Sequence, residues 1–222
     1  MGKVVQGPAL DFDPQEVLAP VYKFVDYQIL VSANVDLGAK SIEQLVDMSK
    51  QQDGGLFFGG YGATSVVNTV NGVIAKGLDL QFTAVDYPGP AQILTSLVRG
   101  DAQYTVGAPN AVMPQVDAGH IKFLGAVADE RYPQFPDVPS LREAGYQGYM
   151  PKVWNGLFTN SETPDEVLNA IAADLRELIA DPAFRESLEP RISGVLQRDS
   201  TPERFRKELS EETEVWKGIF KH

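Results

Sequence analysis

The chain has 222 residues, of which 43% are hydrophobic and 22% are charged, so it can bury a proper core in one domain or in two small ones. Its formal net charge of -11 argues against binding to nucleic acids or to anionic membrane surfaces. No cysteine is present and the only histidines are His120 and His222, which excludes disulfides and thiol catalysis and nearly excludes metal clusters and histidine-dependent triads.

Segments typical of strands and helices alternate through the first two thirds of the chain. Hydrophobic patterning predicts strands at 28–32, 56–60, 80–87, 102–108 and 121–128. Helices are predicted between them, at 41–52, from Thr64–Ser65 onward and at 91–100, with a helix or turn at 111–119. Ser41 and Gln44 have the spacing of a capping box. This order predicts a parallel or mixed sheet with helices on both faces.

A glycine-rich turn at 59–65 is the most informative local pattern. Gly59, Gly60 and Gly62 follow a strand and precede Thr64 and Ser65, which open a helix of valines at helical spacing. A strand that ends in glycines at a helix N-terminus presents free N–H groups suited to an anion. The pattern is neither GxGxxG nor a Walker loop, which disfavours a nucleotide and leaves a small carboxylate or phosphate. A turn that only connects two elements is the alternative.

The last third of the chain changes character. Segment 129–151 is rich in proline, glycine and tyrosine, and it predicts a crossover or hinge with one short helix at Ser140. A strand is predicted at 153–159. Three helices follow, each opened by a capping residue and a proline: Thr163–Pro164, Asp181–Pro182 and Thr201–Pro202. Glu166 is placed to complete a capping box with Thr163.

These landmarks, in this order, resemble the periplasmic substrate-binding proteins of tripartite tricarboxylate transporters (the TctC or Bug family). The resemblance covers nearly the whole chain, from Asp13 to Phe220, and it is most specific at 86–104, 113–146 and 153–175. It implies an α/β fold of the periplasmic-binding-protein-like (type II) kind with two lobes. It also implies a non-catalytic receptor that delivers a small carboxylate to membrane transporter subunits, without a cofactor or metal.

The resemblance also assigns the glycine-rich turn a role. In the family, this turn is one of two loops that hold a ligand carboxylate through backbone amides and small hydroxyls. Carried over by position, it implies ligand contacts at Gly60, Tyr61, Gly62, Ala63, Thr64 and Ser65, with Gly107 and Ala108 facing the cleft. After the strand AQYTV (102–106), family members commonly carry an acidic or polar residue that faces the cleft. Here that position is Gly107, so the resemblance does not imply recognition of an amino group on the ligand.

The front of the chain departs from the family pattern. No signal peptide pattern and no proline- and glycine-rich loop precede Asp13. We therefore expect residues 27–128 to form a complete second lobe, and 1–26 with 129–222 to form crossover segments and the C-terminal part of an incomplete first lobe. An incomplete lobe leaves strand edges and apolar surface uncovered, which predicts a homo-dimer, a swapped assembly or poor solubility, and weak ligand binding.

Two other classes of protein stay open at this point. A cytoplasmic α/β effector-sensing domain of a regulator fits the absence of a signal peptide, although no helix-turn-helix or basic segment is present. An α/β enzyme is disfavoured because cysteine, usable histidines and a recognisable acid–base pair are missing. Asp129 and Glu130 are adjacent, and a solvated turn is the better account of them.

Overall fold

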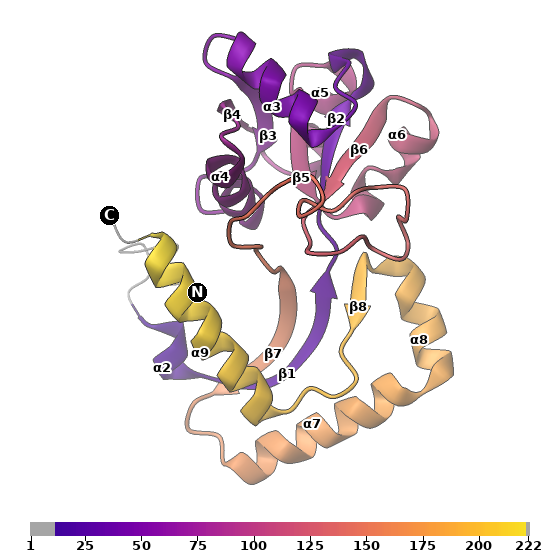
Figure 1. The fold of residues 1–222 in the computed structure, drawn as a ribbon. Coiled ribbons are helices and arrows are strands. Elements are labelled where there is room, and N and C mark those ends of the chain that lie inside the picture. Colours follow the sequence, from indigo (N-terminus) through magenta and orange to yellow (C-terminus); the bar gives the residue numbers. More distant parts are fainter. Residues whose placement is uncertain (1–11, 221–222) are drawn as a thin grey trace. The chain divides into compact units, whose positions relative to one another are not determined.

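The computed structural model describes residues 12–220, which divide into two compact units (Figure 1). Unit 1 contains the chain up to Tyr27 and again from Trp154 onward, and unit 2 contains Gln28–Val153. The chain passes between the units twice, at Tyr27/Gln28 and at Val153/Trp154. Segment 129–153, which we expected among the crossover segments, is grouped with unit 2.

Unit 2 is built on a five-stranded mixed sheet with the strand order β4-β3-β5-β2-β6. Its strands are β2 (Leu30–Asn34), β3 (Leu56–Gly60), β4 (Phe82–Asp86), β5 (Tyr104–Gly107) and β6 (Ile121–Ala126). Strand β3 runs parallel to β4 and β5, whereas β2 runs antiparallel to β5 and β6. The predicted mixed sheet is therefore confirmed.

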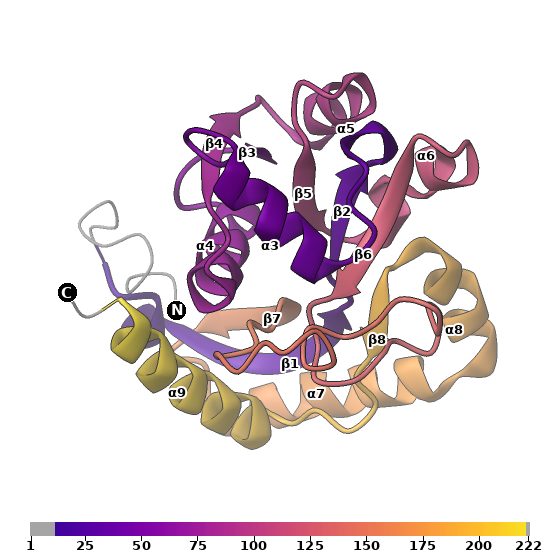
Figure 2. The same ribbon diagram turned by 45° about the horizontal axis from the view of Figure 1, so that its top comes forward.

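The helices of unit 2 begin and end for local reasons visible in the sequence. They are α3 (Ile42–Gln51), α4 (Val66–Leu78), α5 (Pro90–Arg99) and the short α6 (Met113–Asp117), with 3-10 turns η2 (Val35–Leu37) and η3 (Pro109–Ala111). The Ser41 hydroxyl accepts the N–H of Gln44 at 3.3 Å and caps α3 as predicted, while the Gln44 side chain accepts from Lys40 N. Helices α3 and α4 lie on the same side of the sheet (Figure 2).

Segment 129–153 folds against unit 2 as a series of turns rather than as the short helix predicted at Ser140. The Glu143 carboxylate accepts the Ser140 N–H at 2.8 Å and pairs with Arg131 at 3.0 Å, which holds a closed turn. Leu141 and Tyr146 are fully buried. These contacts fix the segment to unit 2 without a regular helix.

Unit 1 contains a separate three-stranded antiparallel sheet with the order β7-β1-β8. Its strands are β1 (Leu18–Tyr27), β7 (Trp154–Asn160) and β8 (Gly194–Leu196). The sequence predicted β7 but not β1 or β8. Strand β1 lies in the centre and buries Ala19, Val21, Tyr22 and Val25, so its pattern shows no simple alternation of polar and apolar residues.

In the described part of unit 1 the helices are α2 (Pro14–Val17), α7 (Asp165–Ala180), α8 (Pro182–Leu188) and α9 (Pro202–Ile219), with the 3-10 turn η4 (Glu189–Arg191). Asp181 and Thr201 cap α8 and α9 as predicted. The capping box predicted at Thr163 is wrong, because Pro164 is the N-cap residue of α7 and no side chain caps it. The Thr163 hydroxyl instead shares a hydrogen bond with the Thr159 hydroxyl at 3.0 Å.

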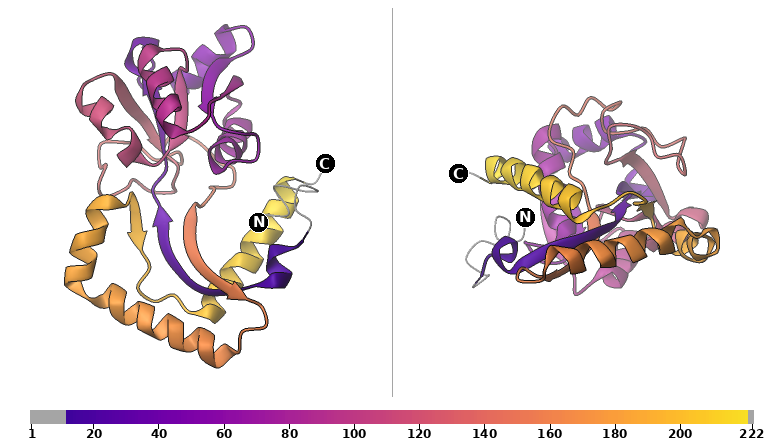
Figure 3. Two further views of the ribbon diagram at one scale, coloured as in Figure 1. Left: turned by 180° about the vertical axis from the view of Figure 1, so that it is seen from behind. Right: turned by 90° about the horizontal axis from the view of Figure 1, so that it is seen from below.

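Helices α7 and α9 lie on either side of β1 (Figure 3). The α7 side is an apolar core in which Leu168, Ala172 and Ile179 pack against β1. On the α9 side Phe205 packs edge-to-face on Trp154, with ring centroids 5.2 Å apart. Among the described residues, no helix combines the length and the apolar character needed to cross a membrane.

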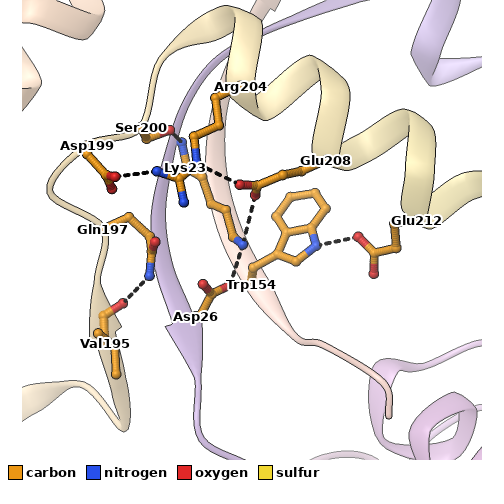
Figure 4. A network of polar contacts seen from close by, with 10 residues as sticks. All are labelled: Lys23, Asp26, Trp154, Val195, Gln197, Asp199, Ser200, Arg204, Glu208 and Glu212. Carbon is orange, nitrogen blue, oxygen red and sulfur yellow. Dashed lines mark hydrogen bonds and ion pairs between the residues drawn. The ribbon is translucent and has the colours of Figure 1, made fainter. Parts of the chain in front are cut away.

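A polar network holds α9 against β1 (Figure 4). The buried Lys23 ammonium pairs with Asp26 at 2.6 Å and with Glu208 at 3.1 Å, and Arg204 pairs with Glu208 at 3.0 Å. Burial opposes the charge of Lys23, but the bonds to the two carboxylates outweigh it and raise the pKa of Lys23. The network links the strand to the first turns of the helix.

Candidate functional site

The carboxyl ends of three parallel strands meet at one edge of the unit 2 sheet. Gly60 ends β3, Asp86 ends β4 and Gly107 ends β5, and Gly60 lies directly opposite Asp86 in the register of β3 and β4. From β3 the chain leads through α4 to β4 on one side, while β5 is the neighbour on the other side. In open α/β sheets, ligands bind outside the carboxyl ends of strands where the connections diverge in this way.

Consecutive glycines at the end of β3 show that helices cover both faces of the sheet here. A Cβ atom built on Gly59 would lie 3.0 Å from Ile93 of α5, and one built on Gly60 would lie 2.1 Å from the Oδ1 of Asn68 of α4. Successive side chains on a strand point to opposite faces. Helices α4 and α5 therefore flank the end of β3, and Gly60 leaves space that the Asn68 side chain fills.

The structure brings all eight predicted site residues to this edge. Gly60 ends β3, 61–64 form the turn, and Ser65 is the N-cap of α4. Gly107 ends β5 and Ala108 is the N-cap of η3. Gly62 has φ of +79°, a value that glycine adopts without strain.

The side chain of Asn68, which the sequence did not single out, organises the turn. Its Oδ1 accepts the Tyr61 N–H and the Ser65 hydroxyl, both at 3.1 Å. The Ser65 Oγ in turn accepts the Asn68 N–H at 3.2 Å and so caps α4. The Ser65 hydroxyl is thus occupied within the protein.

A carboxylate of the same chain occupies part of the turn. The exposed Asp86 accepts the Gly62 N–H and an Asn68 side-chain N–H through the same Oδ1, both at 3.1 Å. Among residues 12–220, the N–H groups of Ala63 and Thr64 have no acceptor. Two backbone donors of exposed residues in the turn before α4 are therefore open to an external anion, beside one that is taken.

A cavity of about 90 Å³ lies beside the turn, wholly within unit 2. Of the predicted site residues, Tyr61, Gly107 and Ala108 line it. The remaining lining comes from β2, β5, α4, α5 and the η3 region: Ser32, Val67, Pro90, Ile93, Leu94, Thr105, Val106, Ala111 and Val112. None of these side chains is charged. The cavity accordingly suits the uncharged part of a small molecule.

Ser32 and Thr105 are lining residues that the sequence did not indicate, since each is a single hydroxyl in an apolar strand. They lie opposite each other on β2 and β5. Other candidates give no site. His120 is exposed and shares a hydrogen bond with Gln115, and no cluster of potential metal ligands occurs within the described part of the chain.

A second cavity, of about 480 Å³, lies wholly within unit 1. Its lining is mainly apolar and includes Leu18, Trp154, Phe158 and Leu209, with Arg206 as its one charged side chain. Arg206 lies 3.9 Å from the Asp165 carboxylate. None of the predicted site residues lines this cavity.

Comparison with known proteins identifies the family to which the chain is similar. Residues 5–221 match the model of the "Tripartite tricarboxylate transporter family receptor". A curated relative from Pseudomonas sp. strain P51, the UPF0065 protein in the tcbD-tcbE intergenic region, is 24% identical over 213 residues, which are 96% of this chain and 63% of the relative. Protein BugT of Bordetella pertussis is 20% identical and is covered to 64%.

Solved structures share the fold. MatC (Rpa3494) from Rhodopseudomonas palustris with bound malate has a TM-score of 0.83 and 24% identity, with 99% of this chain and 75% of that chain covered. R. palustris Rpa4515 with adipate has a TM-score of 0.82 and 22% identity, covering 94% and 69%. The periplasmic binding protein BugD has a TM-score of 0.83, with 20% identity and coverage of 99% and 75%.

The chain thus spans less than two thirds of the length of these curated relatives, while almost all of its own length is matched. The resemblance seen in the sequence and the α/β fold with two separate sheets are both confirmed. The chain belongs to the tripartite tricarboxylate transporter receptor family.

Proposed function

We propose that this chain is a non-catalytic receptor for a small carboxylate, acting in the periplasm and delivering its ligand to the membrane subunits of a tripartite transporter. The observation that carries the proposal is the sheet edge of unit 2, where Tyr61, in the same turn as the open N–H groups of Ala63 and Thr64, lines an uncharged cavity together with Gly107 and Ala108. A carboxylate with a short uncharged body matches both parts. The solved relatives with malate and adipate also hold small carboxylates, although each of these ligands carries a second carboxylate group.

The predicted ligand contacts at Gly60 and Ser65 take an indirect role in this proposal. Gly60 makes room for Asn68, and Ser65 caps α4 and bonds to Asn68. Direct contact with the anion falls to Ala63 and Thr64, and to Gly62 once Asp86 has moved away. The match over residues 5–221 does not favour the alternative of a cytoplasmic effector-sensing domain.

The affinity of this edge alone should be low. Each charge-assisted bond to a backbone donor contributes about 1.5–3 kcal/mol, and association costs several kcal/mol. Two or three such bonds therefore correspond to a dissociation constant no lower than about 1 mM. In the proposed mechanism, tighter binding requires a second group of donors that closes over the ligand.

Charge at the turn provides the test. Thr64 is exposed, so Thr64→Glu adds a negative charge beside the open amides, and Thr64→Gln adds nearly the same volume without charge. Titration with malate, adipate and succinate at low salt should show about fivefold weaker binding for Thr64→Glu and little change for Thr64→Gln. Equal affinities in both variants would refute an anion site at this turn.

A further inference from the structure

We propose that the cavity beside the turn is a subsite for a hydroxyl-bearing carbon next to the ligand carboxylate, and that the Ser32 hydroxyl is the group that recognises it. This inference rests on the proposed carboxylate site and names the part of the ligand that the site selects. The ligand class is a short 2-hydroxy carboxylate.

Ser32 is the polar group of the cavity that lacks a partner. The residue is only 2% exposed, and its side chain forms no hydrogen bond with any residue in 12–220. The Ser32 oxygen is nevertheless not completely enclosed by protein atoms, so it retains contact with open space. Because Ser32 lines the cavity, that space is the cavity itself.

The neighbouring hydroxyl is already engaged. Thr105 lies directly opposite Ser32 in the register of β2 and β5, and it also lines the cavity. Its Oγ1 donates to the Gly59 carbonyl at 2.7 Å. Ser32 therefore offers both a donor and an acceptor to an incoming group, whereas Thr105 offers only remaining acceptor capacity.

The volume of the cavity limits what enters. A water molecule takes about 30 Å³ of liquid volume, so 90 Å³ corresponds to about three waters or a group of three to four heavy atoms. The walls are aliphatic apart from the two hydroxyls and Tyr61, and no charged side chain lines them. A carbon chain with one hydroxyl fits this space, and its carboxylate stays at the turn.

A purely aliphatic group is a poorer occupant. It would displace water from Ser32 and leave that buried hydroxyl without a partner, which is unfavourable. A hydroxyl on the ligand replaces the lost water bond. The preference for a hydroxylated over a plain chain should be about fivefold to tenfold, the range of one net hydrogen bond.

The test compares probes that differ in one hydroxyl, with the full chain labelled for NMR. Lactate should bind about fivefold to tenfold more tightly than propionate to the unaltered protein. In Ser32→Ala the two probes should bind equally, and in Ser32→Val, which fills the cavity, both should weaken. Ser49→Ala is the control, since Ser49 is also buried in unit 2 but its hydroxyl donates to the Val46 carbonyl outside the cavity.

Two further probes separate this inference from the proposed anion site. Formate tests the turn alone and should shift the amides of Ala63 and Thr64 in every variant. Lactamide, which has no charge, should shift the amides of Thr105 and Gly107 more than propionamide does. This difference should disappear in Ser32→Ala. Lactamide binding without formate binding would support the subsite and reject the anion site. The inference would be overturned if the unaltered protein did not prefer lactate to propionate or lactamide to propionamide. It would also be overturned if such a preference survived in Ser32→Ala.

Discussion

The Asp86 carboxylate accepts a hydrogen bond from the Gly62 N–H at 3.1 Å, so the glycine turn already holds a carboxylate of its own chain. An incoming anion would meet the charge of Asp86 and would gain the Gly62 donor only by displacing it. If the turn binds anions as proposed, Asp86 should therefore limit its affinity for them.

Replacing Asp86 with Asn should strengthen binding of succinate. Removal of one nearby negative charge in a largely solvated site is worth about 1 kcal/mol, or about fivefold in the dissociation constant. Calorimetry at low and high salt measures the gain, which should shrink with salt because screening weakens the repulsion. Asp53→Asn is the control, because it removes the same single negative charge at an exposed position before β3. Weaker binding in Asp86→Asn would mean that Asp86 contacts the ligand itself.

Gly60 should tolerate no side chain. The Cβ of Gly60→Ala would lie 2.1 Å from the Asn68 Oδ1, so Asn68 must move and release the Tyr61 N–H. Overpacking of this kind costs about 1–3 kcal/mol in the free energy of unfolding, measured by urea denaturation. The matched control is Gly72→Ala in α4, where a Cβ meets nothing within 4 Å and should stabilise by about 0.5–1 kcal/mol. If Asn68→Ala does not reduce the cost of Gly60→Ala, the clash is not its cause.

Phe205 should be essential to the stability of unit 1. It is 1% exposed and packs on Trp154 and Phe158, with both pairs of ring centroids 5.2 Å apart. Phe205→Ala should cost about 3–5 kcal/mol in the free energy of unfolding. The exposed Val215 on the same helix provides the comparison, and Val215→Ala should stay within about 0.5 kcal/mol. A small effect of Phe205→Ala would contradict the packing of α9 described above.

The turn at Glu143 should respond to acid. The hydrogen bond from Arg131 and the Ser140 N–H lower the pKa of Glu143 from 4.5 to about 2. Because the pKa is lower in the folded state, the contribution of this group to stability is present above pH 4.5 and is lost as the pH falls toward 2. This contribution to the free energy of unfolding is small, since the Arg131 and Glu143 side chains are both partly exposed. NMR titration of the Glu143 carboxyl should show the low pKa, and Arg131→Met should raise it toward the ordinary value; an unchanged pKa would exclude Arg131 as its cause.

The three-stranded sheet of unit 1 predicts self-association. Within the described residues the outer edge of β7 pairs with no strand, Leu157 on β7 is 37% exposed, and the 480 Å³ apolar cavity adjoins β7 at Trp154 and Phe158. Unpaired edges and apolar surface favour contacts between chains. Light scattering should show a mass that rises with concentration, and Leu157→Lys should reduce the rise more than Val167→Lys on α7. A monomer at every concentration would argue that this edge is covered in another way.

The sequence predicted where the residues of the candidate site lie in the fold better than it predicted their hydrogen bonds. Gly62 and Ser65 were predicted correctly as turn and cap, because their roles depend on local backbone geometry. Asp86 and Asn68 were missed because their contacts with the turn arise from the register of β3 and β4 and from the packing of α4. Ser32 was missed because a single serine in an apolar strand carries no local signal.

In the fold, too, the sequence predicted the features that carry local signals and missed those that depend on packing. Unit 2 was predictable because its elements alternate and each has clear turn or cap residues. Strand β1 was missed because burial on both faces removes the alternation that marks a strand. At Thr163 the capping pattern is present, but the bond to Thr159 takes the hydroxyl away from the helix.

The most direct test of the carboxylate site is to locate binding residue by residue, by titrating the labelled full chain with succinate and following backbone amide shifts. The account predicts saturable shifts at Ala63, Thr64, Gly107 and Ala108, with a dissociation constant no lower than about 1 mM. Saturable binding that leaves these four amides unmoved and shifts residues around Arg206 in unit 1 would contradict it.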